Sequence, residues 1–467
     1  MPKPITVLLL SALLLTGCTM IPQYHQPPAP VASQYPSTTT TNESRAADIA
    51  WKDFIADERL QKLTEIALTN NCDLRVAVLN VAQSQAQYRI TRSASFPEVD
   101  ATGSYTRSQT SSAGTGPVAG ASSSYTYSQW SASLGATAYE VDLFGRVRSL
   151  NREALEKYFA TAEAQRSATV LLVAEVATQY FALREAEEQR KLAQQTLSAV
   201  QESYDLNKAS FDAGAINELD LRTADSQVLT ARFNELDYDR QRAQAENALV
   251  LLVGEPLPGV LPAPPPFDAT NLLAGVSPGL PSELTLRRAD ILEAEHTLRA
   301  ANADVGAARA AFFPRIALTA SVGTTSAQLS QLFGARTGVW SFSPQITLPI
   351  FTGGQLRGDL DASKINTRIE VADYEKAIQT AFREVADALV AESSYAEEIE
   401  IESSLARTQQ RRFDLANARY RQGEDSYLNV LSAQQDLYTA QQGMLQARYN
   451  KLAGQIALFK ALGGGWK

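Results

Sequence analysis

Cysteine and histidine, on which most nucleophilic and metal chemistry depends, are scarce in this sequence. The 467 residues include two cysteines, Cys18 and Cys72, and two histidines, His25 and His296. That supply excludes a disulfide framework and leaves too few ligands for a Cys/His metal centre. His296 lies in an Ala/Glu-rich helical context and is interpreted as a packing residue, and Cys72 as a small, half-buried one.

Other signatures of chemistry are equally weak. The sequence holds no His-Glu-x-x-His zinc motif and no P-loop. The pair Gly114-x-Gly116 opens no helix and is too little for a nucleotide fingerprint. A formal charge of −9 makes a nucleic-acid partner unfavourable. We therefore expect no enzymatic activity, no metal and no nucleic acid.

Cys18 is the one residue with a covalent chemistry of its own. Lys3 precedes an apolar run from Ile5 to Leu15, which ends in Leu15-Thr16-Gly17-Cys18. The run is shorter than the ~20 residues of a membrane-spanning helix and is typical of a secretory signal. Its ending resembles the lipobox of bacterial lipoproteins. The resemblance implies a lipoprotein signal peptide at 1–17, with diacylglycerol and an N-acyl chain such as palmitate on Cys18.

An ordinary signal peptide with a chance cysteine is the alternative. Thr19 follows Cys18, and by the rule for such lipoproteins the absence of an aspartate there implies the outer membrane. Residues 18–50 include a stretch rich in Pro, Ser and Thr, so we expect a lipidated, extended tether.

The rest of the chain is an internal duplication. At an offset of 217 residues the segment 73–106 matches 290–323, and further along an offset of 209 pairs Gly214 with Gly423. The change of offset falls in 107–124, a Ser/Gly/Ala-rich stretch expected to be a surface loop. The resulting segments are a first repeat at 51–254, a Pro-rich linker at 255–282, a second repeat at 283–463 and a C-terminal end at 464–467.

Each repeat is expected to contain a helix, two strands, a long helix, a turn and a returning helix. Neither Gly nor Pro interrupts 146–213 or 359–422, which are rich in strong helix formers. At 1.5 Å per residue each helix could reach roughly 100 Å. Helices of that length cannot bury themselves in one globular core, so they must pack side by side as coiled coils. We place the turns between them at Gly214 and Gly423.

The predicted strands alternate between apolar residues and small, hydroxylic ones. The apolar positions are Trp130, Ala132, Leu134, Ala136 and Ala138, then Ile316, Leu318, Ala320 and Val322, and finally Trp340, Phe342, Ile346, Leu348 and Ile350. Runs of about ten residues with period two are typical of transmembrane β-strands. A half-buried sheet in a soluble sandwich is the alternative, but its solvent face would normally carry Lys or Glu.

Four strands per chain cannot close a barrel, and lipid does not tolerate an open sheet edge. Two subunits would give eight strands with a filled interior, whereas three would give twelve strands around a water-filled lumen. A duct therefore favours a homotrimer, although the arithmetic alone leaves four subunits open. The expected fold class is an α+β membrane protein that forms a trimeric 12-stranded β-barrel continuous with a long α-helical barrel.

Several separated motifs resemble one known family, the TolC-type outer-membrane efflux ducts, in its lipoprotein (OprM-like) branch. The segments that carry the resemblance are Trp51-x-x-Phe54 to Asp73-Leu74, Tyr139 to Arg146, Gly306 to Pro314 and Lys460 to Trp466. They occur in the family's order and cover nearly all of the chain after Cys18. Ala289 departs from the pattern, because the family usually has proline there.

The resemblance implies a trimeric outer-membrane channel of a tripartite efflux system with a periplasmic α-barrel. It would meet a periplasmic adaptor (membrane fusion) protein and an inner-membrane pump, usually of the RND type. Drugs or other small toxic compounds would be the cargo, which gives multidrug resistance. A duct of this kind performs no chemistry and needs no cofactor besides its covalent lipid.

The resemblance also implies a gate at the tips of the helical hairpins, with Leu428, Asn429 and Ser432 on the inner face of the periplasmic entrance. Leu428 and Ser432 are one helical turn apart. Family members often have aspartates at the positions of Asn429 and Ser432. Because neither residue is charged here, we expect an apolar ring at Leu428 with polar neighbours. Simple coiled-coil packing of Leu428 is the alternative.

A latch is implied beside the gate. Asp220 matches a family aspartate that links neighbouring hairpins in the closed state, and Tyr420 matches one of its partners. Arg419 and Arg421 could add charge-assisted bonds, whereas Asp425 stands where one branch has a partner arginine. The alternative is that these are solvated tip charges worth under about 1 kcal/mol each.

Two other functions remain open on the sequence alone. One is a type I secretion-like duct that exports proteins. The other is a non-channel lipoprotein scaffold, in which the helices form a coiled-coil spacer and the strands a soluble cap.

Overall fold

The computed structural model describes residues 19–35, 49–111, 124–268, 272 and 281–464. The predicted signal peptide and Cys18 lie outside the described residues. The chain forms two compact units. The first comprises the segments 1–27, 82–160 and 294–373, and the second the segments 28–81, 161–293 and 374–467.

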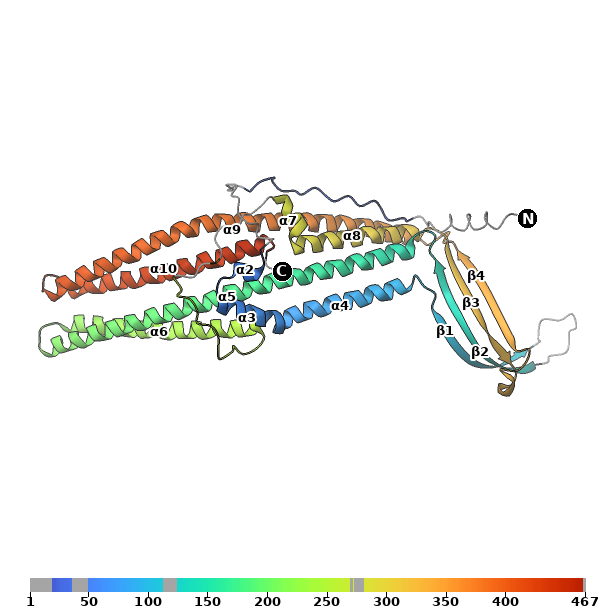
Figure 1. Cartoon of the computed structure of the whole chain (residues 1–467), viewed down its shortest axis with the longest axis horizontal. Helices are drawn as coiled ribbons and strands as arrows, with labels where there is room; N and C mark the ends of the chain where they lie inside the picture. Colours follow the sequence, from blue (N-terminus) through green and yellow to red (C-terminus); the bar gives the residue numbers. More distant parts are fainter. Residues whose placement is uncertain (1–18, 36–48, 112–123, 269–271, 273–280, 465–467) are drawn as a thin grey trace. The chain divides into compact units, whose positions relative to one another are not determined.

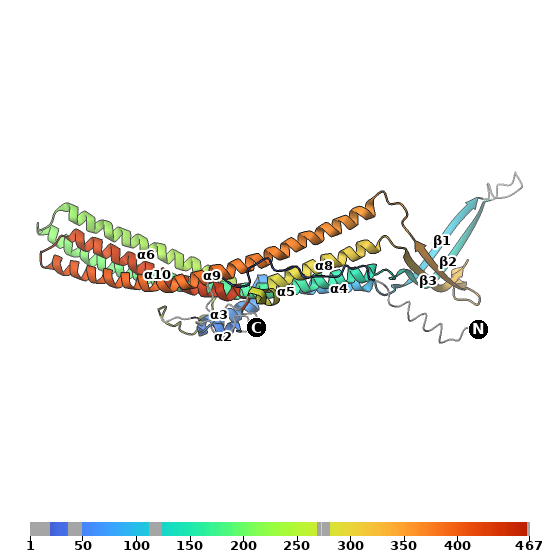
Figure 2. The same cartoon turned by 90° about the horizontal axis from the view of Figure 1, so that it is seen from above.

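The first unit contains a four-stranded antiparallel sheet (Figure 1). Its strands are β1 (Val99–Ser111), β2 (Ser124–Val141), β3 (Arg315–Ser326) and β4 (Gly338–Thr347), in that spatial order. Within each repeat the two strands pair with each other, and β2 and β3 pair across the repeats (Figure 2). The sheet therefore unites the two copies while β1 and β4 remain as its edges.

The two faces of the sheet differ in chemistry as the alternation predicts. On one face hydroxyl groups pair across strands, with Thr102 Oγ1 2.9 Å from Ser133 Oγ and Ser321 Oγ 2.7 Å from Ser341 Oγ. On the other face the rings of Tyr105 and Trp130 lie 4.4 Å apart. Cross-strand pairs of this kind stabilise a sheet, and the polar face satisfies its own hydroxyls without charge.

The alternation is interrupted once, at a point that the sequence does not reveal. β2 has a β-bulge between Ala136 and Tyr139, where Ala138 adopts a positive φ of 51° and its N–H donates to Thr319 Oγ1. A bulge inserts one extra residue into a strand, so the residues after it point to the opposite faces. Ala138 is therefore not on the predicted apolar series, and Tyr139 takes that face opposite Leu318.

Two strand boundaries also differ from the prediction. β1 continues to Ser111, into the segment expected to be a loop, because its pairing with β2 persists. β4 ends at Thr347, before Leu348 and Ile350, because Pro349 lacks the N–H that a further ladder bond needs.

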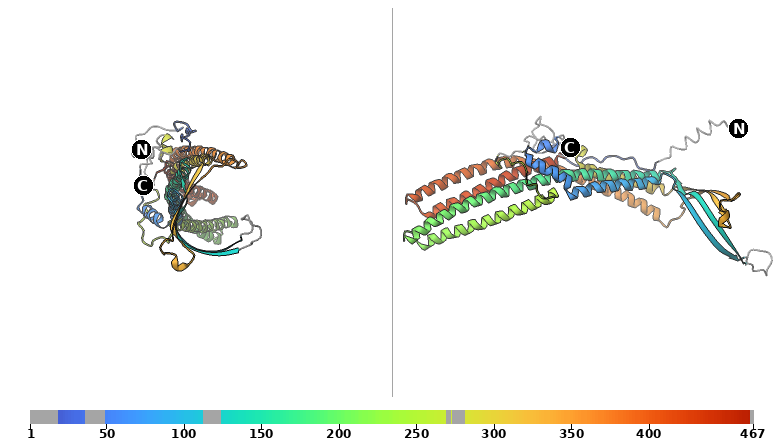
Figure 3. Two further views of the ribbon diagram at one scale, coloured as in Figure 1. Left: turned by 90° about the vertical axis from the view of Figure 1, so that its right-hand side faces the viewer. Right: turned by 60° about the horizontal axis from the view of Figure 1, so that its bottom comes forward.

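The second unit is helical. It contains most of two hairpins, α5 (Arg146–Asp212) with α6 (Glu218–Val253), and α9 (Gln355–Arg421) with α10 (Tyr427–Ala461); α5 up to residue 160 and α9 up to residue 373 belong to the first unit. These hairpins lie side by side (Figure 3). The shorter helices among the described residues are α2 (Trp51–Phe54), α3 (Glu58–Asn70), α4 (Cys72–Ser93), α7 (Pro281–Arg287), α8 (Ala289–Ala310) and the 3-10 turn η2 (Leu329–Gln331). The order of elements within each repeat is the predicted one.

Buried side chains hold the helical unit together near its N-terminal helices. Asp57 caps α3, and its Oδ2 accepts a hydrogen bond of 2.7 Å from Tyr180 on α5. The rings of Phe54 and Phe459 stack at 3.9 Å. These contacts attach α2 and α3 to the long helices, so the N-terminal helices belong to the same core.

Cys72 is exposed at the start of α4, so its half-buried interpretation is wrong. The buried position belongs to the preceding residue, Asn71, whose amide donates to Leu252 O and accepts from Leu74 N. In the described part of the chain no helix is both long enough and apolar enough to cross a membrane.

Candidate functional site

The two hairpin tips have the same backbone geometry. Gly214 follows α5 with a φ of 70°, and Gly423 follows α9 with a φ of 74°. In the first tip Ala215 N donates to Ser210 O at 2.8 Å, and in the second Glu424 N donates to Arg419 O at 3.0 Å. This is the Schellman closure, which requires a left-handed residue that glycine adopts without strain. The structure therefore places both predicted turn residues at the tips.

An apolar cluster joins the two hairpins just behind the tips. All four long helices contribute to it. Its members are Ala224, Tyr427, Val430 and Leu431, with Tyr204, Phe413, Ala416 and Tyr420 packed against them. Because the cluster spans both hairpins, moving one hairpin away from the other would expose these side chains to water.

A buried amide lies at the edge of this cluster. Asn207 on α5 is 3 % exposed, and its Nδ2 donates to Ser203 O at 2.9 Å. Its Oδ1 accepts a hydrogen bond of 3.5 Å from Tyr420 on α9. Burial raises the pKa of Tyr427, which a hydrogen bond with Ser203 and one with Asn207 partly offset. Tyr420 is thus linked to the first hairpin by a hydrogen bond to Asn207.

Asp220 is not brought to Tyr420 within the chain. It lies in the first turn of α6, where its N–H donates to the capping side chain of Asn217 at 3.0 Å. Within the described part of the chain its carboxylate has no hydrogen bond or ion pair, and the same holds for the guanidinium of Arg421, which is exposed. The four latch residues therefore do not form one cluster in a single chain.

Arg419 and Asn429 meet at Asp425, a residue that the resemblance does not place in the latch. Asp425 lies 3.5 Å from Arg419 Nε, accepts from Asn429 Nδ2 at 2.5 Å and accepts from Ser426 N at 2.9 Å. The hydrogen bonds from Asn429 and Ser426, together with the Arg419 charge, hold the pKa of Asp425 below its usual range. Asp425 thus interacts with Arg419, Asn429 and Ser426 at the second tip.

Leu428 and Ser432 lie on the exposed side of α10. Leu428 is 67 % exposed, so packing within its own hairpin does not explain it. Ser432 Oγ accepts a hydrogen bond of 3.4 Å from Arg412 on α9, and Arg412 also pairs with Asp436. This pair, which we call the α9–α10 clasp (Arg412 and Asp436), ties the two helices beside the predicted gate.

Sequence reasoning missed Asn207, Arg412 and Asp436. The repeat itself contains a signal for them, because each differs in kind from its counterpart 209 residues away. Asn207 corresponds to Ala416, Arg412 to Ser203 and Asp436 to Gln227. A charge, or a polar group opposite an apolar residue, that appears in only one copy is a candidate for a role in only one hairpin.

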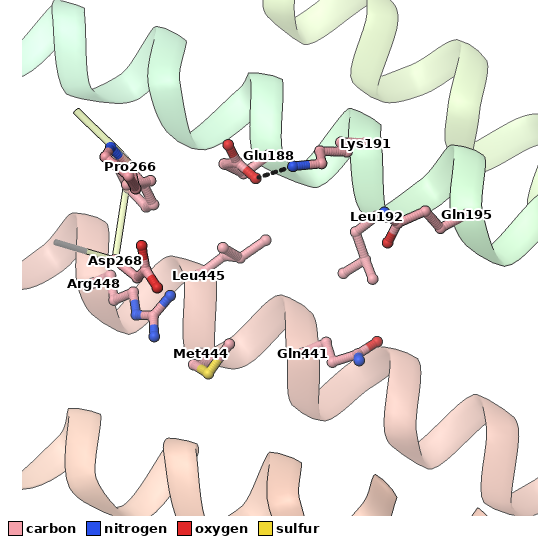
Figure 4. Close-up of a pocket in the computed structure, with 11 residues that line it drawn as sticks. Glu188, Lys191, Leu192, Gln195, Pro266, Asp268, Gln441, Met444, Leu445 and Arg448 are labelled. Atoms are coloured by element: carbon pink, nitrogen blue, oxygen red, sulfur yellow. Dashed lines mark ion pairs between the residues drawn. The ribbon is translucent and has the colours of Figure 1, made fainter. Parts of the chain in front are cut away.

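The helical unit also has a surface cavity of about 420 Å³ between α5, α10 and the linker (Figure 4). Glu188 and Lys191 of α5 form an ion pair of 3.7 Å on one wall, and Arg448 of α10 lies opposite beside Asp268. Neither His nor Cys lines it. Among the described residues no group of three or more potential ligands could hold a metal ion.

An amphipathic four-stranded sheet with two open edges, combined with long helical hairpins that end in narrow tips, defines a subunit of a membrane channel. The family model for outer membrane efflux proteins matches residues 63–255 and 280–464. The chain therefore belongs to the outer membrane efflux protein family.

Relatives support the same assignment over the full length. The chain is 45 % identical to the toluene efflux pump outer membrane protein TtgC of Pseudomonas putida, over 100 % of this chain and 96 % of that protein. It is 42 % identical to the outer membrane protein OprJ of Pseudomonas aeruginosa, over 98 % and 95 %. The predicted role as the outer-membrane channel of an efflux system is thereby confirmed.

Solved structures show the same fold. The open state of the Neisseria gonorrhoeae MtrE outer membrane channel matches with a TM-score of 0.88 at 40 % identity, over 96 % of this chain and 99 % of that chain. A CusC structure matches with a TM-score of 0.83 at 36 % identity, over 96 % and 100 %. The predicted fold class, an α+β chain that supplies four strands to a trimeric channel, is confirmed.

Proposed function

We propose that this channel exports small toxic compounds, organic solvents and antibiotics among them, rather than proteins. The observation that carries the proposal is the full-length match to relatives named as toluene and antibiotic efflux pump proteins. The duct itself performs no chemistry. Its contribution is a path lined by uncharged hydroxyl groups, which offers little to bind a cargo tightly and so suits release to the exterior.

The assembly that we propose has three further parts. Cys18 carries diacylglycerol and an N-acyl chain, which anchor the subunit in the inner leaflet of the outer membrane. A periplasmic adaptor contacts the helical hairpins, and an inner-membrane pump of the RND type supplies the energy. The lipobox-like sequence supports the anchor, and the efflux pump names of the relatives support the partners.

The gate that we propose lies at the second hairpin tip. Leu428 forms an apolar ring where three copies meet, with Asn429 and Ser432 beside it. Its 67 % exposure in the single chain supports a partner outside the chain. Tyr420 and Asn207 hold the two hairpins of one subunit together. Asp220 and Arg421 remain available for links to a neighbouring subunit, and Arg419 would join them by exchanging its partner Asp425.

Deletion and complementation test the cargo class. A strain without this gene should become susceptible to toluene, dyes and antibiotics, and the wild-type gene should restore growth. Secretion of the strain's exported proteins should be unaffected. Loss of a secreted protein with unchanged susceptibility would overturn the proposal in favour of protein export.

Planar bilayers test the gate. Leu428→Ala should raise the single-channel conductance of the resting state, because the narrowest apolar ring becomes wider. Leu219→Ala, at the equivalent position of the first tip and 74 % exposed, is the matched control and should leave conductance unchanged. Equal effects of the two substitutions would remove the gate assignment from Leu428.

A further inference from the structure

The first described residues of the chain, 19–24, form a strap along α8. Going toward the N-terminus, the contacts move toward the C-terminal end of the helix. Tyr24 OH donates to Glu295 Oε1 at 3.2 Å, Asn302 Nδ2 donates to Pro22 O at 2.9 Å, and Arg309 Nη1 donates to Met20 O at 3.5 Å. The strap is therefore antiparallel to α8 and has a fixed direction.

Close packing reinforces these hydrogen bonds. A Cβ at Gly306 would lie 2.8 Å from the Cα of Ile21, so this helix position accepts the strap only without a side chain. The Arg299 guanidinium lies 5.1 Å from the centre of the Tyr24 ring. Burial beside Glu295 raises the pKa of Tyr24 to about 12, which keeps its hydroxyl protonated as a donor.

Covalent geometry then limits where the lipid begins. Cys18 lies outside the described residues, but it is three residues before Ile21 and so within ~10 Å of it. Phe313 is seven residues after Gly306, on the order of 10 Å along the direction of α8. The described part of the strap, from Tyr24 to Met20, leads toward this end of the helix, so Phe313 is within reach of a lipid attached to the residue before Thr19.

An apolar cavity of about 290 Å³ opens at this place, between the end of α8 and the ends of β2 and β4. The rings of Phe144 and Phe313 stack there at 4.8 Å, and Val141, Leu143 and Pro314 add to the apolar lining. The charges at its rim are already paired, because Glu140 binds both Arg146 and Arg315, and Asp142 binds Arg148. The cavity thus lacks a free charge that would select an ion.

We propose that this cavity receives an acyl chain of the lipid on Cys18. The occupant is part of the same molecule, since Cys18 immediately precedes the strap, whose path from Tyr24 to Met20 leads toward the end of α8 that borders the cavity. The inference rests on the proposed lipidation of Cys18. Its consequence is that the lipid acts as a structural element joining α8 to the foot of the sheet, in addition to being a membrane anchor.

Photocrosslinking tests the proposal on the full-length, processed protein. Cells are fed a fatty acid that carries a diazirine, and the purified channel is irradiated and digested for mass spectrometry. The N-terminal peptide is weighed first, to establish that Cys18 carries lipid. Intramolecular adducts on the peptides of Leu143, Phe144 and Phe313 are the expected result. Lipid on Cys18 with adducts only on phospholipid or on other faces would overturn the cavity while leaving the anchor intact.

Two variants are expected to prevent the proposed binding in different ways. Ala311→Phe fills the cavity, and Gly306→Ala displaces the strap while leaving the cavity open. Each should reduce the cavity adducts by roughly tenfold, the change expected for a loss of about 1.4 kcal/mol. Ala308→Phe, on α8 but outside the cavity, is the matched control and should retain the cavity adducts.

Heat-modifiable migration shows that each variant assembles. Undiminished adducts in both assembled variants would contradict the proposal, and an unmodified Cys18 would overturn the anchor and the inference together.

Discussion

The two hairpin tips share one backbone geometry but differ in their side-chain contacts. Gly214 and Gly423 close their tips with the same left-handed turn and the same hydrogen bonds. Side chains that link the hairpins do not repeat. Tyr420 of the second hairpin donates to Asn207 of the first, whereas the equivalent residues are Phe211 and Ala416, which cannot form that bond.

The helices within each hairpin are also tied differently at the tips. α9 and α10 are joined by the clasp of Arg412 and Asp436, whose counterparts Ser203 and Gln227 carry no charge. The duplication thus fixed the turn geometry in both copies, because glycine is needed there. The contacts between helices differ: Asn207 and Tyr420 link the two hairpins, and Arg412 with Asp436 links α9 to α10.

The largest expected effect tests whether the two repeats also differ in packing at the C-terminal ends of α6 and α10. Gly254 and Gly463 both have positive φ, 80° and 73°. A Cβ at Gly254 would lie 2.5 Å from the backbone oxygen of Asn70, but one at Gly463 would come no closer than 3.2 Å to any atom, the nearest being Cγ of Arg288. We expect Gly254→Ala to cost about 2–4 kcal/mol, from backbone strain plus overpacking, and Gly463→Ala about 1 kcal/mol.

Guanidinium unfolding in detergent, followed by helical circular dichroism, measures both free energies. The wild-type slope with denaturant must be retained for the comparison to hold. Equal losses in the two variants would show that the copies are equivalent at this joint and that only the positive φ matters.

The next effect breaks the link between the hairpins. Asn207→Leu removes the buried acceptor of Tyr420 and leaves that hydroxyl without its partner, which costs about 1–3 kcal/mol. If the hairpins separate during opening, this loss should raise the open population by about tenfold. Single-channel recordings measure that population. Phe211→Tyr is the matched control, because it adds a hydroxyl at the repeat position equivalent to Tyr420, on a side chain that is 36 % exposed, without touching the Asn207 link.

The sequence predicted the elements better than the contacts between them. Helix length, strand alternation and the positions of both tip glycines follow from local periodicity and backbone preference, which a sequence displays directly. The pairing of Asn207 with Tyr420 depends on how two packed helices are rotated about their axes. Local periodicity does not determine that rotation.

The same limit explains the strand and gate results. The bulge at Ala138 is set by the Thr319 hydroxyl on the neighbouring strand, so β2 alone does not display it. Asp220 was assigned to the latch by resemblance, and its single-chain environment gives it no partner among the described residues. A residue whose partner belongs to another subunit cannot be paired from one chain, and its role stays a prediction.

A smaller effect tests the difference in how the two helices of each hairpin are tied together at the tip. Arg412→Ala removes the clasp, whose charges are 50 % and 44 % exposed, so the expected loss is under about 1 kcal/mol and is screened by salt. Hydrogen exchange of α10 between Tyr427 and Asp436 should rise by a fewfold. Arg222→Ala breaks an exposed pair with Glu218 inside α6 and is the control. Exchange that rises equally at both tips would remove the distinction between the hairpins.

The smallest effect is a difference in acid response between the tips. The pKa of Asp425 is lowered by hydrogen bonds from Asn429 and Ser426 and by the Arg419 charge. A lowered carboxyl pKa gives stability that is present above the ordinary value of about 3.9 and is lost as pH falls through the folded value. The first tip is capped by the amide of Asn217, which does not titrate.

Hydrogen exchange, corrected for its intrinsic pH dependence, should therefore show the second tip loosening first below about pH 4. Asn429→Ala should move that midpoint upward, toward the ordinary value, because the first and largest stabilising hydrogen bond is gone. A common midpoint for both tips, unmoved by this substitution, would mean that global protonation governs them and that Asp425 has no special part.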